Sequence, residues 1–443
     1  MLLLEANKMK SLSDICDYLQ EGIKTARRLN ASDAKLIFKR AENNGCDFQD
    51  SRLKTIYTKK DSSYTITVIV DGRSGTASGN DLDDIDEMVE RAASLARVGN
   101  KVNFESYPLP AEIKKVKTYS EKTASLTMDK MIESCQTIVD GLMAYNPELT
   151  IMAYAGKGIS EKAIVTSGGV CHTSRNTHWW LGSGVQRTRG TDVLLTGYGR
   201  NWKDLNEFYD PHFILNRIIE NLSISKTNVE PPKGKVPAFL DYEILDLFLL
   251  PIIKIGINGR NVAKGDSPLK GKLKEQILDP SITVIDDPHL DYSSSTVEID
   301  EDGIPTQVIP IINEGFLENF LYDLDSAGLA QAKPTGNDGC SPYSPKVLPG
   351  QKSSRDLLAS IKDGLYIKSI MGFTQGDIMN GDFSGNVALG FRIKDGEIVG
   401  RVKDTMVAGN VYELLKKNVE LSSDYEPMRR LPFAVINGIN VVS

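Results

Sequence analysis

The stretch GDIMNGDFSGNVALGFRIKDGEIVGRVKDTMVAGNVYELL, residues 376–415, decides the local fold near the end of the chain. Its first half alternates apolar residues with small or charged ones, which predicts a strand with one apolar face. The apolar positions of that strand are Val387, Leu389, Phe391 and Ile393. Residues 394–397 contain Asp-Gly, a pair that readily adopts the positive φ angles of a type I′ turn. Residues 398–402 are therefore expected to return as the second strand of a hairpin.

The residues after this hairpin predict a helix. Asn410 is a favourable N-cap, and Glu413 stands three positions later, as in a capping box. Four apolar residues then recur at helical spacing: Val411, Leu414, Leu415 and Val419. Local chemistry thus predicts a hairpin that leads into a helix, without indicating a function.

The same stretch carries a family resemblance. The segment GDFSGNVALGFRIKDGEI, followed by the turn Ala408-Gly409-Asn410, resembles the closing signature of the TldD/PmbA family, the so-called modulators of DNA gyrase. The resemblance extends over most of the chain, from about Asp33 to Val441. It implies an intracellular, zinc-dependent peptidase that is assembled from two related subunits.

Length and charge narrow the class of protein. The chain has 443 residues, enough for two domains with their own cores, and its 25% charged and 40% hydrophobic residues are ordinary for a globular protein. The formal net charge is −7, and no run is strongly basic. Proteins that bind nucleic acid usually show a basic patch, so direct contact with nucleic acid is not expected.

The cysteines and the apolar runs of the chain indicate in which cellular compartment the protein is expected. The five cysteines are scattered without a CxxC pair, which is typical of a reducing environment. The opening MLLLEANKMK is too short and polar for a signal peptide, and no apolar run reaches about 18 residues. We therefore expect a cytoplasmic protein without a membrane span.

The order of helical and strand patterns predicts an α+β fold with two domains. Helices are expected at residues 11–29, 81–97, 127–144 and 212–222 in the first half, with short strands at 34–39, 54–58, 64–70 and 76–78 and an antiparallel sheet over 150–199 that turns at 156–158 and 168–169. The second half predicts a helix at 242–255, strands at 282–285, 296–299 and 365–370, and helices near 324–331 and 354–362.

The best linker is KTNVEPPKG, residues 226–234, because its two prolines stiffen the chain and a glycine ends it. The predicted organisation is an N-terminal helix at 1–30, an α+β domain with a helix and an antiparallel sheet at 31–225, the linker at 226–234, and a strand-rich, barrel-like α+β domain at 235–443.

The resemblance implies where zinc ought to bind. The family's zinc subunits carry His-Glu-x-x-x-His on the helix that opens the second domain, and the segment GDSPLKG at 265–271 sets the register. The motif positions here are Leu250, Pro251 and Ile255, none of which can bind zinc or act as a base. The family's cysteine ligand near the C-terminus is also missing, since residues 419–442 contain no cysteine. The chain thus resembles the PmbA/TldE-type subunit, with no catalytic or metal residue of its own and zinc expected in the partner.

Histidines offer the alternative metal candidates. His289 lies within DDPHLD, residues 286–291, where carboxylates and an imidazole could hold a divalent cation, although Asp and Pro also favour a plain turn. His172 and His178 lie near Cys171, but their spacing fits no zinc pattern, so a structural role is favoured.

Nucleophile and nucleotide signals are weak. Ser384 lacks the Gly-x-Ser-x-Gly elbow, and nothing near Cys340 in the sequence would lower the pKa of its thiol. The glycines at 336–339 lack the Gly-Lys-Ser/Thr ending of a phosphate-binding loop.

A binding role remains. Hairpin-rich sheets offer edges to which an extended peptide can add as a strand. The candidate groove segment is Gly381, Asp382, Phe383, Ser384 and Gly385, whose glycines would allow close approach of a peptide or would serve tight packing alone.

The resemblance implies a zinc-bearing, TldD-like partner in a heterodimer that receives unfolded peptides. The isolated chain could pair with itself as a homodimer. An independently active hydrolase and a non-enzymatic interaction protein are the alternatives.

Overall fold

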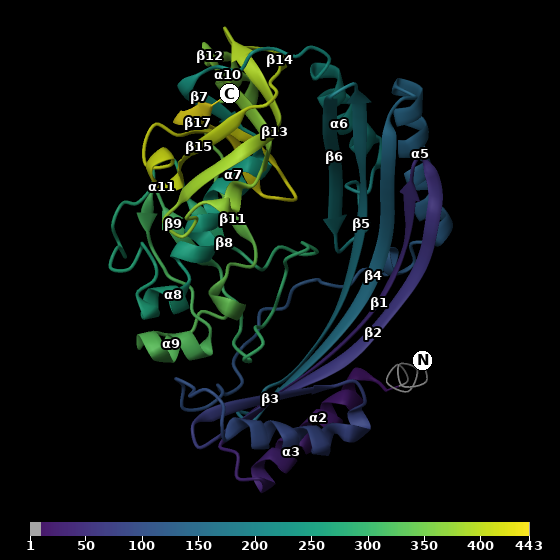
Figure 1. Ribbon diagram of the computed structural model, residues 1–443. Helices are drawn as coiled ribbons and strands as arrows, with labels where there is room; N and C mark the ends of the chain where they lie inside the picture. Colours follow the sequence, from purple (N-terminus) through teal and green to yellow (C-terminus); the bar gives the residue numbers. More distant parts are fainter. Residues whose placement is uncertain (1–9, 443) are drawn as a thin grey trace.

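The computed structural model describes residues 10–442. The predicted N-terminal segment at 1–30 is therefore described only from residue 10, and nearly all of the opening MLLLEANKMK lies outside the described residues. The chain forms a long curved sheet with helices, followed by a compact strand-rich unit on the inner side of the curve (Figure 1). The α+β class and the two units agree with the sequence prediction.

The first unit is a six-stranded antiparallel sheet in the order β3-β2-β1-β4-β5-β6. Its strands are β1 (Asp33–Gln49), β2 (Arg52–Val70), β3 (Arg73–Gly79), β4 (Thr150–Thr166), β5 (Cys171–Arg189) and β6 (Asp192–Trp202). The predicted strands at 34–39, 54–58, 64–70 and 76–78 lie within β1, β2 and β3, but β1 and β2 are much longer than predicted, because they pair along nearly their full length with one register shift after Asp47. The turn predicted at 156–158 was also wrong, since these residues lie inside β4.

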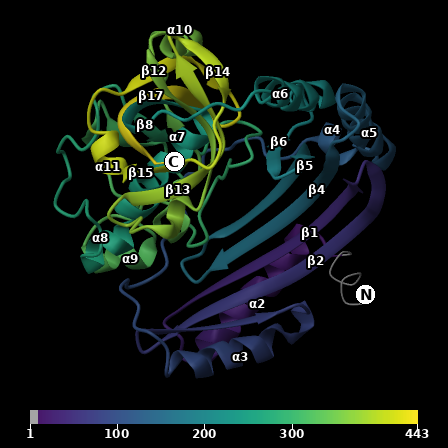
Figure 2. The ribbon, with the colours of Figure 1, turned by 45° about the horizontal axis from the view of Figure 1, so that its top comes forward.

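Helices of this unit cover one face of the sheet. They are α2 (Leu12–Arg28), α3 (Ile85–Ala96), α4 (Glu121–Ala124), α5 (Met128–Tyr145) and α6 (Pro211–Ile224). Caps fix the starts of two of these helices: the hydroxyls of Ser11 and Thr127 accept backbone N–H bonds from the first turns of α2 and α5. Helices α2 and α3 cover one end of the sheet, and α5 and α6 cover the other (Figure 2).

The second unit is built on a closed ring of five strands in the order β12-β7-β17-β15-β13, with β13 pairing back to β12. The strands of this sheet are β7 (Gly234–Leu240), β12 (Asp363–Met371), β13 (Asp382–Lys394), β14 (Glu397–Arg401), β15 (Met406–Asn410), β16 (Glu420–Glu426) and β17 (Leu431–Val442). The closed ring confirms the predicted barrel-like domain, whose core is a large cluster of buried aliphatic and aromatic side chains.

The hairpin that was predicted from residues 387–402 is confirmed as β13 and β14. Asp395 and Gly396 have φ angles of 48° and 81°, as a type I′ turn requires. Asn410 caps the next helix by accepting the N–H groups of Tyr412 and Glu413, as predicted. That helix, α11 (Val411–Leu414), is shorter than predicted: its last apolar residues belong to the barrel core through tertiary packing rather than through a longer helix.

Four short strands and several short helices complete the second unit. The strands are β8 (Val284–Asp286), β9 (Ile309–Asn313), β10 (Phe316–Leu317) and β11 (Pro345–Val347). The helices are α7 (Tyr242–Leu250), α8 (Gly259–Lys264), α9 (Leu324–Ala330) and α10 (Ser354–Ala359). The strand predicted at 296–299 was wrong, because that segment is a loop that makes a single bridge between Ile299 and Pro305.

The contacts between the two units include an apolar one and an ionic one. At one, β6 and α6 share a continuous apolar cluster with β12 and β13, and Arg401 of β14 forms a 2.9 Å ion pair with Asp192. At the other, Lys35 of β1 forms a 2.6 Å ion pair with Asp302 in a loop of the second unit. Helix α6 ends at Ile224 and β7 begins at Gly234, so the predicted linker lies between them, and the exact domain limits remain predictions.

Candidate functional site

Helix α7 presents its polar side to a cavity between the two units. Its apolar residues Ile244, Leu245, Phe248 and Leu249 are buried in the barrel core. Glu243 and Asp246 stand three positions apart, so they share the other side of the helix. The sequence therefore positions two carboxylates at the cavity by the same periodicity that buries the apolar residues.

A proline changes the geometry of the chain after α7. Pro251 has no backbone N–H, so it cannot make the helical hydrogen bond to the fourth residue before it. Residues Pro251–Gly256 form a π-helical turn, in which the N–H of Ile257 donates to the carbonyl of Ile252 over 3.0 Å. The predicted helix at 242–255 is thus α-helical only as far as Leu250. The turn brings Lys254 to the cavity wall.

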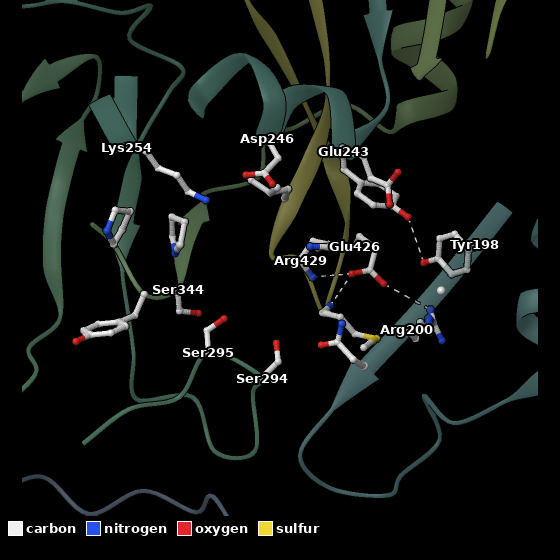
Figure 3. A pocket seen from close by; sticks show the side chains of 18 residues that line it. Tyr198, Arg200, Glu243, Asp246, Lys254, Ser294, Ser295, Ser344, Glu426 and Arg429 are labelled. Atoms are coloured by element: carbon white, nitrogen blue, oxygen red, sulfur yellow. Dashed lines mark hydrogen bonds and ion pairs between the residues drawn. The ribbon is translucent and has the colours of Figure 1, made fainter. Parts of the chain in front are cut away.

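Both units contribute to this cavity, which has a volume of about 150 Å³ (Figure 3). One wall comes from β6, another from α7 and the π-helical turn, and the remainder from the loops at 294–295 and 342–345 and the turn between β16 and β17. The charged side chains that line it are Arg200, Glu243, Asp246, Lys254, Glu426 and Arg429. Cations and anions are present in equal number, so the cavity is polar without a strong excess of either sign.

Glu426 lies at the centre of this cavity, between Arg200 and Arg429 (Figure 3). Its Oε2 accepts backbone N–H bonds of 2.7 Å from Met428 and Arg429. Its Oε1 lies 3.5 Å from Nη2 of Arg200, which in turn stacks on the ring of Phe213 at 3.4 Å. Both ion-pair partners are buried, so this pair joins β6 to the turn of the barrel unit at low dielectric.

Burial also affects the acids of α7. It raises the pKa values of Glu243 and Asp246 above their ordinary range, and the nearby charge of Arg429 opposes the rise for both carboxyls. The neighbouring Asp241 is held by Tyr366, whose hydroxyl donates to it over 3.0 Å, and by Lys368 at 3.6 Å. The acids that line the cavity are therefore distinct from the carboxylate that anchors the start of α7.

Aromatic residues lie flat on the inner face of the sheet, the face opposite the helices. Trp180 faces Gly156 across the ladder between β4 and β5, His178 faces Gly158, and Tyr154 faces Gly182. A Cβ atom at Gly182 would lie 2.5 Å from the Tyr154 hydroxyl, so the glycines make room for the rings. We call Met152, Tyr154, His178 and Trp180 the aromatic shelf.

The aromatic shelf adjoins the charged cavity. Met152, Tyr154 and Trp180 line a second hollow of about 500 Å³ that also reaches Arg200, Glu243 and Arg429. Met152 and Tyr154 are 54% and 39% exposed, which is unusual for large apolar side chains in the middle of a sheet. A third hollow, lined by Leu195, Lys368 and Ser369 among others, continues from Tyr198 and Glu243 along β6. We refer to these three hollows together as the interdomain groove.

The residues at the zinc-motif positions do not fit a zinc ion. Pro251 is buried, and Leu250 and Ile255 are half-buried, so all three positions hold aliphatic side chains that are wholly or partly shielded from solvent. Across residues 10–442, no group of three or more His, Cys, Asp or Glu side chains is placed to hold a metal ion. The donor set at this helix is thus incompatible with the family's metal chemistry.

The predicted groove segment 381–385 lies in the barrel wall at the start of β13. Phe383 is buried and stacks on Phe373 with a ring separation of 4.7 Å, and the carboxylate of Asp382 accepts a 2.8 Å hydrogen bond from Asn410. Cβ atoms at Gly381 and Gly385 would each lie 2.5 Å from a neighbouring side chain. Ser384 pairs with Ala408 of β15. These residues do not line the interdomain groove, and a contact with substrate there stays a prediction.

The other candidate residues are dispersed. His289 Nε2 contacts the Thr306 hydroxyl at 3.0 Å, while the adjacent Asp287 is occupied by Arg430 and Lys346. His172 Nε2 lies 3.3 Å from Glu298. Burial raises the pKa of the Cys340 thiol, whose sulfur lies 3.0 Å from the Ser326 hydroxyl. None of these side chains lines the interdomain groove as the structure describes it.

Sequence reasoning missed the residues of the cavity and the shelf. Two signals were available: the pair Glu243 and Asp246 in an otherwise apolar helix, and the repeated glycines in β4 and β5. Neither signal shows which distant segment would lie opposite. Arg200, Glu426 and Arg429 carry no local signature at all.

The fold and the groove define a two-unit α+β protein with a polar cleft at the join. Family models for the "PmbA/TldA metallopeptidase C-terminal domain" and "PmbA/TldA metallopeptidase domain 1" match residues 233–443 and 34–96. The chain belongs to the TldD/PmbA family. Across residues 10–442, no helix is long and apolar enough to cross a membrane.

Individual relatives agree with this assignment. A metalloprotease of Methanothermobacter thermautotrophicus is 32% identical over 203 residues, which is 44% of each chain. A metalloprotease TldD homolog of Haemophilus influenzae is 22% identical over 88% of this chain and 85% of its own length. The crystal structure of TldE from Thermococcus kodakarensis has the same fold, with a TM-score of 0.87 and 20% identity over 96% of this chain and 100% of that chain.

Proposed function

We propose that this chain is the zinc-free subunit of a TldD/TldE-type peptidase complex and that its interdomain groove forms part of the path for unfolded polypeptide. The observation that carries the proposal is the set of aliphatic residues at the zinc-motif positions, in the same segment as Lys254, which lines the groove. A groove lined with hydrogen-bonding groups, next to a helix that has lost its catalytic residues, is suited to holding substrate for a partner's active site.

Strand β6 supplies a second argument for the handling of peptides. It ends the strand order of the sheet, and no other strand among residues 10–442 pairs with its outer edge. Residues Leu195 to Asn201 of β6 line the hollows of the groove. An extended peptide can add to such an edge through backbone hydrogen bonds, whatever its sequence, while side chains of the groove contact alternate residues.

The test is hydrolysis of a disordered polypeptide in zinc-containing buffer by three samples: this chain, a zinc-bearing TldD-like relative, and their mixture. We expect no turnover by this chain alone and faster turnover by the mixture than by the relative, abolished by a chelator. Light scattering of the mixture should give the mass of a heterodimer.

Two results would contradict the proposal. Turnover that follows this chain through purification would indicate an independent hydrolase. Binding of polypeptide without any effect on the relative's turnover would indicate an interaction protein. A light-scattering mass of a monomer at micromolar concentration would rule out the homodimer of the isolated chain.

A further inference from the structure

Four charged side chains at the cavity are without partners. Glu243, Asp246, Lys254 and Arg429 line the 150 Å³ cavity, and no hydrogen bond or ion pair of their side chains occurs within residues 10–442. Arg429 nevertheless affects both acids, since its charge opposes the rise in pKa that burial causes for Glu243 and Asp246. Charges of both signs thus share one cavity without making contact, which leaves each of them free to bind a ligand.

A buried carboxylate oxygen points to the same conclusion. Glu426 is 8% exposed, and its Oε1 has no hydrogen-bond donor. The nearest cation, Nη2 of Arg200, lies at 3.5 Å, and Arg200 is fixed by its stacking on Phe213. A buried acceptor without a donor lowers stability, so a ligand that donates a hydrogen bond in this cavity would recover that energy.

The aromatic shelf provides the apolar part of the site. Met152, Tyr154 and Trp180 form the sheet side of the 500 Å³ hollow, which shares Glu243 and Arg429 with the charged cavity. The facing glycines leave the rings flat and accessible. A flat aromatic surface of this kind favours the stacking of an aromatic or a bulky apolar group.

Size limits what can enter. A cavity of about 150 Å³ encloses roughly one benzene-sized group, so the charged cavity admits the end of a ligand rather than a long chain. The adjoining hollow has room for one further residue and its side chain. The site therefore suits a small ligand with one ammonium group, one carboxylate and one apolar side chain.

We propose that the cavity and the aromatic shelf bind a short zwitterionic peptide with an aromatic side chain. Its ammonium group lies against Glu243, Asp246 and the free oxygen of Glu426, its carboxylate lies against Arg429 and Lys254, and its ring stacks on Trp180. The inference deepens the proposed function, because it names peptides with free ends as ligands of this subunit.

Tryptophan fluorescence can test this directly. The chain has three tryptophans, and Trp179 and Trp202 are 0% and 6% exposed, so a ligand on the shelf affects Trp180 most. The probe is phenylalanyl-phenylalanine with free ends, compared with its N-acetylated and C-amidated forms. We expect saturable quenching by the free dipeptide and a Kd that is about tenfold higher when either end is blocked, because each blocked form loses a charge-assisted hydrogen bond.

Substitutions test which side chains of the protein bind the charged ends of the dipeptide. Glu243→Gln and Arg429→Gln should each raise the Kd of the free dipeptide about tenfold. Arg52→Gln, an exposed cation on β2 outside the groove, should leave it unchanged. Trp180→Phe should remove the fluorescence response while calorimetry still detects binding, because phenylalanine preserves the stacking surface. Unchanged melting temperatures would show that the variants fold.

The outcomes separate this inference from the proposed function. Equal affinity for free and blocked dipeptides, or no effect of Glu243→Gln and Arg429→Gln, would overturn the zwitterion site. If the mixture with a zinc-bearing relative is active while the free dipeptide does not bind, the inference fails and the proposed function stands. If the dipeptide binds as expected while the mixture gains no activity, the inference stands and the proposed function fails.

Discussion

Two of the contacts between the sheet unit and the barrel unit differ in their chemistry. The contact at β6 and α6 is a large apolar cluster that includes Trp179 and Leu181 of the sheet and Phe391 of the barrel. The contact at β1 and β4 joins a small cluster around Ile37 and Ile299 to several ion pairs. We refer to them as the apolar contact and the ionic contact.

The ionic contact centres on the loop at 300–304. Besides the pair between Lys35 and Asp302, Glu301 lies 2.7 Å from Lys39 and 3.3 Å from Lys162. Asp300 is fully buried in the same loop. Apolar burial is insensitive to pH and is weakened little by salt, whereas ion pairs and buried acids respond to both. The apolar contact is therefore expected to be insensitive to pH and salt, whereas the ionic contact responds to both.

The largest effect is expected at the apolar contact. Phe391 is 0% exposed in the cluster shared by both units. Phe391→Ala should lower the free energy of unfolding by about 3–5 kcal/mol, because it leaves a cavity where the two units meet. Urea unfolding measures this change, with Phe316→Ala, an exposed aromatic on β10, as the control. A loss below about 1 kcal/mol would show that this cluster does not hold the units together.

The next effect is a pH dependence at the ionic contact. Burial and the charge of Asp302 raise the pKa of Asp300 to about 8. The folded protein therefore keeps this proton at pH values where the unfolded chain has released it, and stability falls as the pH rises from about 4 to about 8. Asp300→Asn should remove this loss, on the order of 4 kcal/mol between pH 5 and pH 8, because it carries no titrating proton.

Urea unfolding at pH 5 and pH 8 checks this prediction. The matched control is Asp61→Asn at an exposed position on β2. Its free energy of unfolding should change between pH 5 and pH 8 as much as that of the unchanged protein. If the free energy of unfolding of Asp300→Asn changes with pH as much as that of the control, the ionic contact does not respond to pH through this carboxyl.

A smaller effect is expected at the ion pair that joins the two units. Lys35 and Asp302 are largely buried, with side chains 16% and 18% exposed. Lys35→Met keeps the length of the side chain and removes its charge, so it should lower stability by about 1–2 kcal/mol through the unpaired carboxylate. The loss should shrink in 1 M salt, measured by thermal unfolding. A loss that is independent of salt would indicate altered packing instead.

The smallest effect is expected at an exposed ion pair away from both contacts. Arg392 makes two 3.0 Å hydrogen bonds to Asp363 on the surface of the barrel. Arg392→Gln should change stability by about 0–1 kcal/mol, since water screens exposed pairs. Thermal unfolding provides the measurement. A loss as large as that of Lys35→Met would remove the distinction between interdomain and surface ion pairs.

Local chemistry made part of the fold predictable. The Asp-Gly turn at 395–396 and the cap at Asn410 depend on neighbouring residues alone, and the structure confirms both predictions. Strand lengths in β1 and β2 were not predictable, because pairing across the sheet extends strands through residues with no alternating pattern. The end of α11 was also predicted wrongly. The apolar residues after Leu414 pack in the barrel core without continuing the helix.

By itself, the sequence determined the family and the aliphatic character of Leu250, Pro251 and Ile255, because ligand chemistry is a property of residue types. Tertiary structure alone decided that Arg200, Glu243, Glu426 and Arg429 share a cavity and that the aromatic shelf faces it. These side chains come from β6, α7, and the end of β16 with the turn that follows it, which are distant along the chain. Their placement in one cavity depends on how the cores of the two units pack against each other, and no local sequence pattern predicts it.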